Sequence, residues 1–149
     1  MQLRLNSVDP CTLLTDAQRG PLGLNPGSST GENFGGPVQG TVCVWTSKAS
    51  APDNEYTGGA VLNHGAEYAL GAEPVRTVGG FAATTTTSMG SDPNFYCGLL
   101  VDVAPGQALS ATYDNPAKDA PGMTRALACD KAQQLATAML ATLRIQQNK

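Results

Sequence analysis

The sequence has little charge of either sign. Only 14% of its 149 residues are Asp, Glu, Lys or Arg, against about a quarter in typical globular domains. The nine basic residues are scattered singly from Arg4 to Lys149, and the formal net charge is -3. Nucleic-acid binding needs clustered cations to neutralise phosphates, so this composition excludes a nucleic-acid partner.

Long apolar runs are also missing. None approaches the roughly 18 residues needed to cross a bilayer. No apolar segment with a small-residue cleavage site precedes Cys11, so no export signal is visible. If the protein is exported, we expect this chain to be a mature form from which the signal has been removed.

The usual catalytic motifs are absent. There is one histidine, His64, and no Gly-x-Ser-x-Gly or Gly-Lys-Ser/Thr segment. Because His64 lies between Asn63 and Gly65, we interpret it as a loop residue rather than a general base. The carboxylates weighed for acid-base chemistry are scattered along the chain, namely Asp92, Asp102, Asp114, Asp119 and Asp130. We therefore predict a protein that is not an enzyme, with no catalytic residues and no cofactor.

The four cysteines are Cys11, Cys43, Cys97 and Cys129. None forms the closely spaced pair typical of zinc sites, so we predict no metal site. An even number of dispersed cysteines in a chain of low charge indicates two disulfides and an oxidising compartment. The alternative is four buried thiols in a cytosolic protein.

The pattern of residues predicts an α+β domain spanning 1–149. A short helix should begin at Thr12 or Thr15 and stop at Gly20-Pro21, and a long helix should cover 123–147. Residues 20–40, with seven glycines and three prolines, indicate an exposed flexible loop. Strands are expected over 41–47, 56–63, 75–88 with a bend at Gly79-Gly80, 94–103 and 107–113, the last two as a hairpin.

These elements suggest an antiparallel sheet of about five strands, with both helices packed on one face. At helical spacing, one stripe of the long helix should pack on the sheet: Ala128, Cys129, Ala132, Leu135, Ala136, Met139 and Leu143. Of the three possible connectivities we favour Cys11–Cys129, joining the two helices, and Cys43–Cys97, joining two strands.

Aromatic side chains are the remaining candidates for ligand binding. Trp45, Tyr56 and Tyr68 could line a small-molecule pocket. Trp45 shares a strand face with Cys43, so the favoured interpretation for Trp45 is that it covers a disulfide in the core.

Several short motifs carry a resemblance to a known family. They are Asp9-Pro10-Cys11, Cys43-x-Trp45, the stretch from Val75 to Ala82 with its Gly-Gly-Phe-Ala end, Tyr96-Cys97 and Cys129-Asp130. In this order they resemble an actinobacterial family of exported lipoproteins that is catalogued only as a domain of unknown function. The chain is more distantly similar to the two-disulfide extracellular sensor domains of actinobacterial Ser/Thr kinases.

The resemblance implies an extracytoplasmic domain, secreted or held at the outer face of the cell membrane by an N-terminal lipid anchor that this sequence lacks. We expect a monomeric accessory or binding module of the cell envelope. One alternative is a small-molecule sensor or carrier with an aromatic-lined pocket. Another is a structural partner of an envelope protein complex, which would expose an apolar patch.

Overall fold

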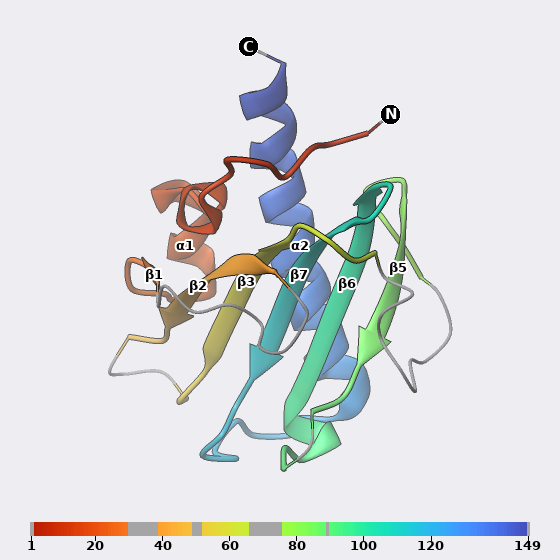
Figure 1. Ribbon diagram of the computed structural model, residues 1–149. Helices are drawn as coiled ribbons and strands as arrows, with labels where there is room; N and C mark the ends of the chain where they lie inside the picture. The colour runs from red at the N-terminus through yellow and green to blue at the C-terminus, as the bar shows by residue number, and fades with distance from the viewer. Residues whose placement is uncertain (1, 30–38, 49–51, 66–75, 89, 149) are drawn as a thin grey trace.

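The computed structural model describes residues 2–29, 39–48, 52–65, 76–88 and 90–148 (Figure 1). The helical elements are η1 (Pro10–Leu13), α1 (Asp16–Leu22), η3 (Pro93–Phe95) and α2 (Arg125–Gln147). The strands are β1 (Ser28–Ser29), β2 (Gly40–Thr46), β3 (Glu55–Val61), β4 (Arg76–Val78), β5 (Phe81–Thr86), β6 (Tyr96–Ala104) and β7 (Gln107–Asp114). Within these residues, no helix has the length and hydropathy of a membrane span.

The strands form one antiparallel sheet in the order β1-β2-β3-β7-β6-β5-β4. The α+β class and the β6–β7 hairpin are therefore confirmed. The sheet has seven strands where about five were predicted. One extra strand comes from the division of the predicted strand 75–88. Gly79 and Gly80 both adopt positive φ and form a turn between β4 and β5 rather than a bend within one strand.

The second extra strand corrects the prediction of a flexible loop over 20–40. Residues 20–22 belong to α1, and Leu24 is buried in the core. Ser28–Ser29 then pairs with β2. Gly27 explains how so glycine-rich a segment can pack, because a Cβ there would lie 2.4 Å from Nε1 of Trp45. Residues 30–38 lie outside the described part of the chain.

Helix α2 covers one face of the sheet (Figure 1). It begins after the N-cap Thr124, whose hydroxyl accepts a hydrogen bond from the Leu127 N–H. The predicted apolar stripe is confirmed, since all of its residues are buried: Ala128, Cys129, Ala132, Leu135, Ala136, Met139 and Leu143. The opposite face of the sheet lies away from α2.

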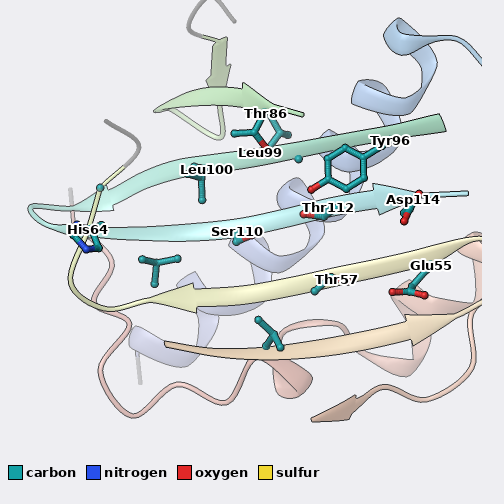
Figure 2. Close-up of a pocket in the computed structure, with 14 residues that line it drawn as sticks. Glu55, Thr57, His64, Thr86, Tyr96, Leu99, Leu100, Ser110, Thr112 and Asp114 are labelled. Carbon is teal, nitrogen blue, oxygen red and sulfur yellow. The ribbon is translucent and has the colours of Figure 1, made fainter. Parts of the chain in front are cut away.

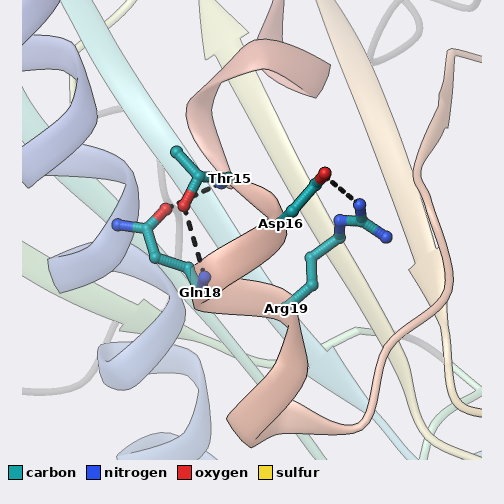
Figure 3. Close-up of polar contacts among 4 residues, drawn as sticks. All are labelled: Thr15, Asp16, Gln18 and Arg19. Carbon is teal, nitrogen blue, oxygen red and sulfur yellow. Dashed lines mark hydrogen bonds and ion pairs between the residues drawn. The ribbon is translucent and has the colours of Figure 1, made fainter.

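The short helix α1 begins with a capping box (Figure 3). The Thr15 hydroxyl accepts from the Gln18 N–H at 3.2 Å, and the Gln18 side chain accepts from the Thr15 N–H at 2.8 Å. An Asp16–Arg19 ion pair follows on the exposed side. The start at Thr15 agrees with one of the two predicted entries, but the helix continues through Pro21 and ends at Gly23 in the left-handed conformation.

The predicted number of disulfides, two, is confirmed, but the predicted pairing was wrong. The bonds join Cys11 to Cys43 and Cys97 to Cys129. Cys43 lies in β2 and Cys97 in β6, with β3 and β7 between them. Three strand spacings amount to about 14 Å, whereas a disulfide spans at most about 7 Å between Cα atoms. Each bond therefore ties a strand to the helical segment beside it.

Candidate functional site

Of the three predicted ligand-binding aromatics, the two that the structure describes do not lie on an accessible surface. Trp45 and Tyr56 are 0% and 1% exposed and belong to the core between the sheet and α2. Tyr68 lies outside the described residues. Trp45 and Cys43 share the inner side of β2, and both border Gly27. The structure thus gives Trp45 the core position that its strand face predicted and directs the search for a site to the other side of the sheet.

That other side, which we call the open face, carries a cavity of about 440 Å³ (Figure 2). This volume lies within the range of small-molecule sites. Strands β2, β3, β5, β6 and β7 and the loop after β3 contribute its lining, which comprises Val42, Glu55, Thr57, Val61, His64, Gly65, Thr86, Tyr96, Gly98, Leu99, Leu100, Ser110, Thr112 and Asp114. Strand register arranges these side chains in rows across the sheet.

The first row is acidic. In the antiparallel ladders Asp114 lies directly opposite Glu55 of β3 on one side and directly opposite Tyr96 of β6 on the other. Figure 2 shows these three side chains together at one end of the cavity. Two carboxylates at directly opposed positions repel each other, which makes this an unfavourable pair for a sheet.

The second row consists of hydroxyl groups around a glycine. Thr86, Gly98, Thr112 and Thr57 are successive partners across β5, β6, β7 and β3. A Cβ at Gly98 would lie 2.4 Å from Oγ1 of Thr86 and 3.4 Å from the Tyr96 hydroxyl oxygen. The missing side chain lets these oxygens gather over the backbone of β6, so the row forms a polar floor.

Beyond the hydroxyl row the lining of the cavity is more apolar. Leu100 lies opposite Ser110, and Val61 lies opposite Ala108. Val61, Ala108 and Leu100 form a small hydrophobic cluster separate from the main core. His64 marks this end of the cavity in Figure 2. The cavity therefore runs along the strands from an acidic end to an apolar end.

Burial and neighbouring charge make the acidic end unusual. Burial raises the pKa of Glu55, and the carboxylates of Asp114 and Asp53 raise it further. Burial also raises the pKa of Asp114; the Asn115 backbone N–H opposes this change, and the Asp53 carboxylate reinforces it. Within the described part of the chain, neither Glu55 nor Asp114 forms an ion pair with Lys or Arg. No ion pair within the described residues therefore offsets the negative charge of these two carboxylates.

This electrostatic cost predicts a pH dependence. A carboxylate whose pKa is raised by folding binds more protons in the folded than in the unfolded state at pH values between its unfolded and folded pKa. The free energy of unfolding therefore falls as the pH rises from the unfolded pKa to the folded pKa. Glu55→Gln/Asp114→Asn should therefore be more stable than the wild type at pH 7, by up to about 1 kcal/mol after solvent screening. The difference should vanish below about pH 4.

Urea unfolding of both proteins across this pH range tests the prediction. Asp130→Asn, on the exposed side of α2, removes one negative charge away from the acidic end and serves as the control. A stability difference that grows as the pH falls would contradict the assignment of the cost to Glu55 and Asp114.

Two backbone contacts hold the acidic end in place. Arg125, in the first turn of α2, donates to the carbonyl of Tyr96 at 2.5 Å and to the carbonyl of Thr86 at 3.0 Å.

Burial raises the pKa of the Tyr96 phenol, although its contacts with Thr112 and Thr86 favour the ionised form. The neutral phenol can both donate and accept a hydrogen bond at pH 7.

The arrangement is suited to holding a ligand. It offers carboxylate, phenol and hydroxyl oxygens at one end and aliphatic side chains at the other, a combination typical of small-molecule sites. Among the described residues, no group of three or more His, Cys, Asp or Glu side chains is placed to hold a metal ion. The absence of catalytic residues remains a prediction.

Sequence reasoning missed Glu55. It named Tyr96 in the Tyr96-Cys97 motif but did not place it among the predicted ligand-binding residues, and it considered Asp114 only as one of several scattered carboxylates. The available signal was that Glu55 and Asp114 each stand at the end of a strand. Their opposition depends on the pairing of β3 with β7, which are far apart in the sequence. Local patterns do not supply that pairing.

The fold and the disulfides together define a class of protein. A small α+β domain with two disulfides suggests an oxidising, extracytoplasmic environment.

The chain belongs to a family described as proteins of unknown function (DUF3558), whose model matches residues 2–142. No significant match was found among curated proteins or among solved structures. The resemblance to a family of unknown function is confirmed, while its lipoprotein, actinobacterial and kinase-sensor aspects remain predictions.

Proposed function

We propose that the protein is a non-catalytic, extracytoplasmic binding module that holds a small molecule in the open-face cavity. The proposal includes an origin in the cell envelope, as a secreted domain or one held by an upstream lipid anchor. The observation that carries it is the cavity itself, which combines about 440 Å³ of volume with two opposed carboxylates that reduce the stability of the sheet. Arrangements that break a rule of sheet stability are expected at functional sites.

The structure favours this proposal over a structural partner role. A partner surface should present a contiguous apolar patch. The exposed large apolar side chains among the described residues are Leu127 and Ile145. They lie near opposite ends of α2, about 27 Å apart at the helical rise per residue, and so do not form one patch.

Thermal-shift screening tests the proposal. A panel of envelope metabolites and glycan fragments is compared on the wild type and on Thr112→Tyr, which places an aromatic ring over the cavity floor beside Gly98. A ligand at 100 times its dissociation constant stabilises the folded state by about 2.7 kcal/mol. Hits on the wild type should lose at least about tenfold in affinity for Thr112→Tyr, which corresponds to about 1.4 kcal/mol.

Thr41→Tyr is the matched control, since Thr41 is an exposed residue of β2 that does not line the cavity. It should bind every hit as the wild type does. If the panel gives no hit, or if hits stabilise Thr112→Tyr as strongly as the wild type, the open-face cavity is not a small-molecule site.

A further inference from the structure

The side of α2 that points away from the sheet, which we call the outer face, consists of exposed residues: Leu127, Asp130, Gln134, Thr137, Ala141 and Ile145. Leu127 and Ile145 are 46% and 64% exposed. Ile145 follows Leu127 by 18 residues, which is about five full turns of an α-helix. Both therefore lie at the same angular position about the helix axis, but they are too far apart to cover each other within one molecule.

The outer face also separates charge along its length. Asp130 is exposed in the N-terminal half of α2, and Arg144 is half-buried in the C-terminal half. Within the described part of the chain, neither side chain forms an ion pair. The Arg144 guanidinium donates to the Gly79 carbonyl and lies 5.4 Å from the centre of the Phe81 ring, and these contacts supply no carboxylate for its charge.

The middle of the outer face is hollowed. A shallow depression of about 590 Å³ is lined by Asp130, Gln133, Gln134, Thr137, Ala138 and Ala141. It lies between Leu127 and Ile145 along the helix. Helices with short side chains at their contact pack at the smaller interaxial distances, so a second helix can approach closely here.

A second copy of α2, running antiparallel, complements these features. Leu127 and Ile145 are nine residues on either side of Ala136. A two-fold axis at the level of Ala136 therefore places Leu127 of each copy against the partner's Ile145.

The same axis brings opposite charges together. It places Asp130 about two residues, or about 3 Å along the helix, from the partner's Arg144. By symmetry each match occurs twice in the dimer. A symmetric parallel pair would instead place Asp130 opposite the partner's Asp130, which is repulsive.

We propose that the protein forms a weak, symmetric dimer through the outer faces of two antiparallel α2 helices. This state differs from the monomer expected from the sequence. One face of a 23-residue helix buries less than the roughly 1,000 Å² of a stable interface, so the dissociation constant is expected to be about 0.1 mM. The inference is independent of the proposed function, because the open-face cavity lies on the other side of the sheet.

Sedimentation equilibrium from about 10 µM to about 1 mM protein should show the wild type passing from monomer to dimer. Leu127→Asp and Ile145→Lys each place a charge against an apolar side chain at both symmetry-related contacts. Each variant should therefore self-associate at least about tenfold more weakly than the wild type. Both positions are exposed in the monomer, so thermal unfolding of each variant should match that of the wild type.

An equimolar mixture of Leu127→Asp and Ile145→Lys tests the antiparallel register. In the mixed dimer the new carboxylate at one contact meets the new ammonium group, and the other contact is the native pair of Leu127 and Ile145. The mixture should associate at least about tenfold more tightly than either variant alone. Asn94→Asp and Thr41→Lys introduce the same charges at exposed positions outside α2, and each alone and their mixture should associate as the wild type does.

Three results would overturn the inference. One is a wild type that remains monomeric at about 1 mM. The second is self-association of Leu127→Asp that is as strong as that of the wild type. The third is a mixture of Leu127→Asp and Ile145→Lys that associates no more tightly than either variant alone, because the two helices would then not pair in this antiparallel register.

Discussion

Replacing Cys97 and Cys129 together by alanine is expected to lower the free energy of unfolding by about 4 kcal/mol and the melting temperature by about 10 °C. The chain-entropy estimate depends on the length of the closed loop, and the two cysteines are separated by 32 residues. Both are buried, at 0% and 2% exposure, so losing the sulfur atoms also leaves poorly filled space beneath α2. Urea unfolding monitored by circular dichroism measures the change.

The second disulfide provides a matched comparison. Cys11 and Cys43 are also separated by 32 residues, so chain entropy predicts the same loss for Cys11→Ala/Cys43→Ala. Cys11 is only half-buried. We therefore expect the loss at Cys97–Cys129 to be at least as large as that at Cys11–Cys43. A double variant as stable as the wild type would show that the corresponding bond contributes nothing to stability.

The Cys97–Cys129 bond also bears on the site. Cys97 lies between Tyr96 and Gly98 in β6 and points to the opposite face from both. The bond fixes the strand from its core side to α2, and Arg125 of the same helix holds the carbonyls of Tyr96 and Thr86. Helix α2 therefore fixes the backbone from which the cavity floor is built, although it lies on the other side of the sheet.

Local patterns in the sequence predicted much of the fold. The hairpin of β6 and β7 is signalled by two apolar runs around Pro105-Gly106, and α2 by its helical periodicity. Period-two alternation correctly placed Trp45 and Cys43 on one face of β2. It could not tell which face of the sheet would be covered by α2.

The site depended on contacts that no local pattern contains. The opposition of Glu55 and Asp114 requires the register of β3 against β7. The disulfide partners require the strand order, which separates Cys43 from Cys97 by two strands. Composition predicted two bonds, and topology decided their connectivity.

Asn115→Ala is expected to lower the free energy of unfolding by about 3 kcal/mol, because it removes three hydrogen bonds at once, one of them to the buried Ala120 N–H. Asn115 follows β7 directly and is 0% exposed. Its amide nitrogen donates to the Asp53 carbonyl at 2.9 Å and to the Asp119 carboxylate at 2.9 Å, and its amide oxygen accepts from the Ala120 N–H at 3.0 Å. This one side chain joins the turn before β3 to the segment before α2.

Two further variants separate lost hydrogen bonds from lost shape. Asn115→Asp keeps the shape but places a second carboxylate against Asp119, whose pKa the Asn115 amide now lowers. Its deficit should be large at pH 7 and should shrink as the pH falls and the new carboxyl regains a proton to donate. Asn94→Ala, at an exposed position in η3, should change stability by less than about 0.5 kcal/mol. A deficit in Asn115→Asp that does not change with pH would show that the Asp119 contact is not what Asn115 supplies.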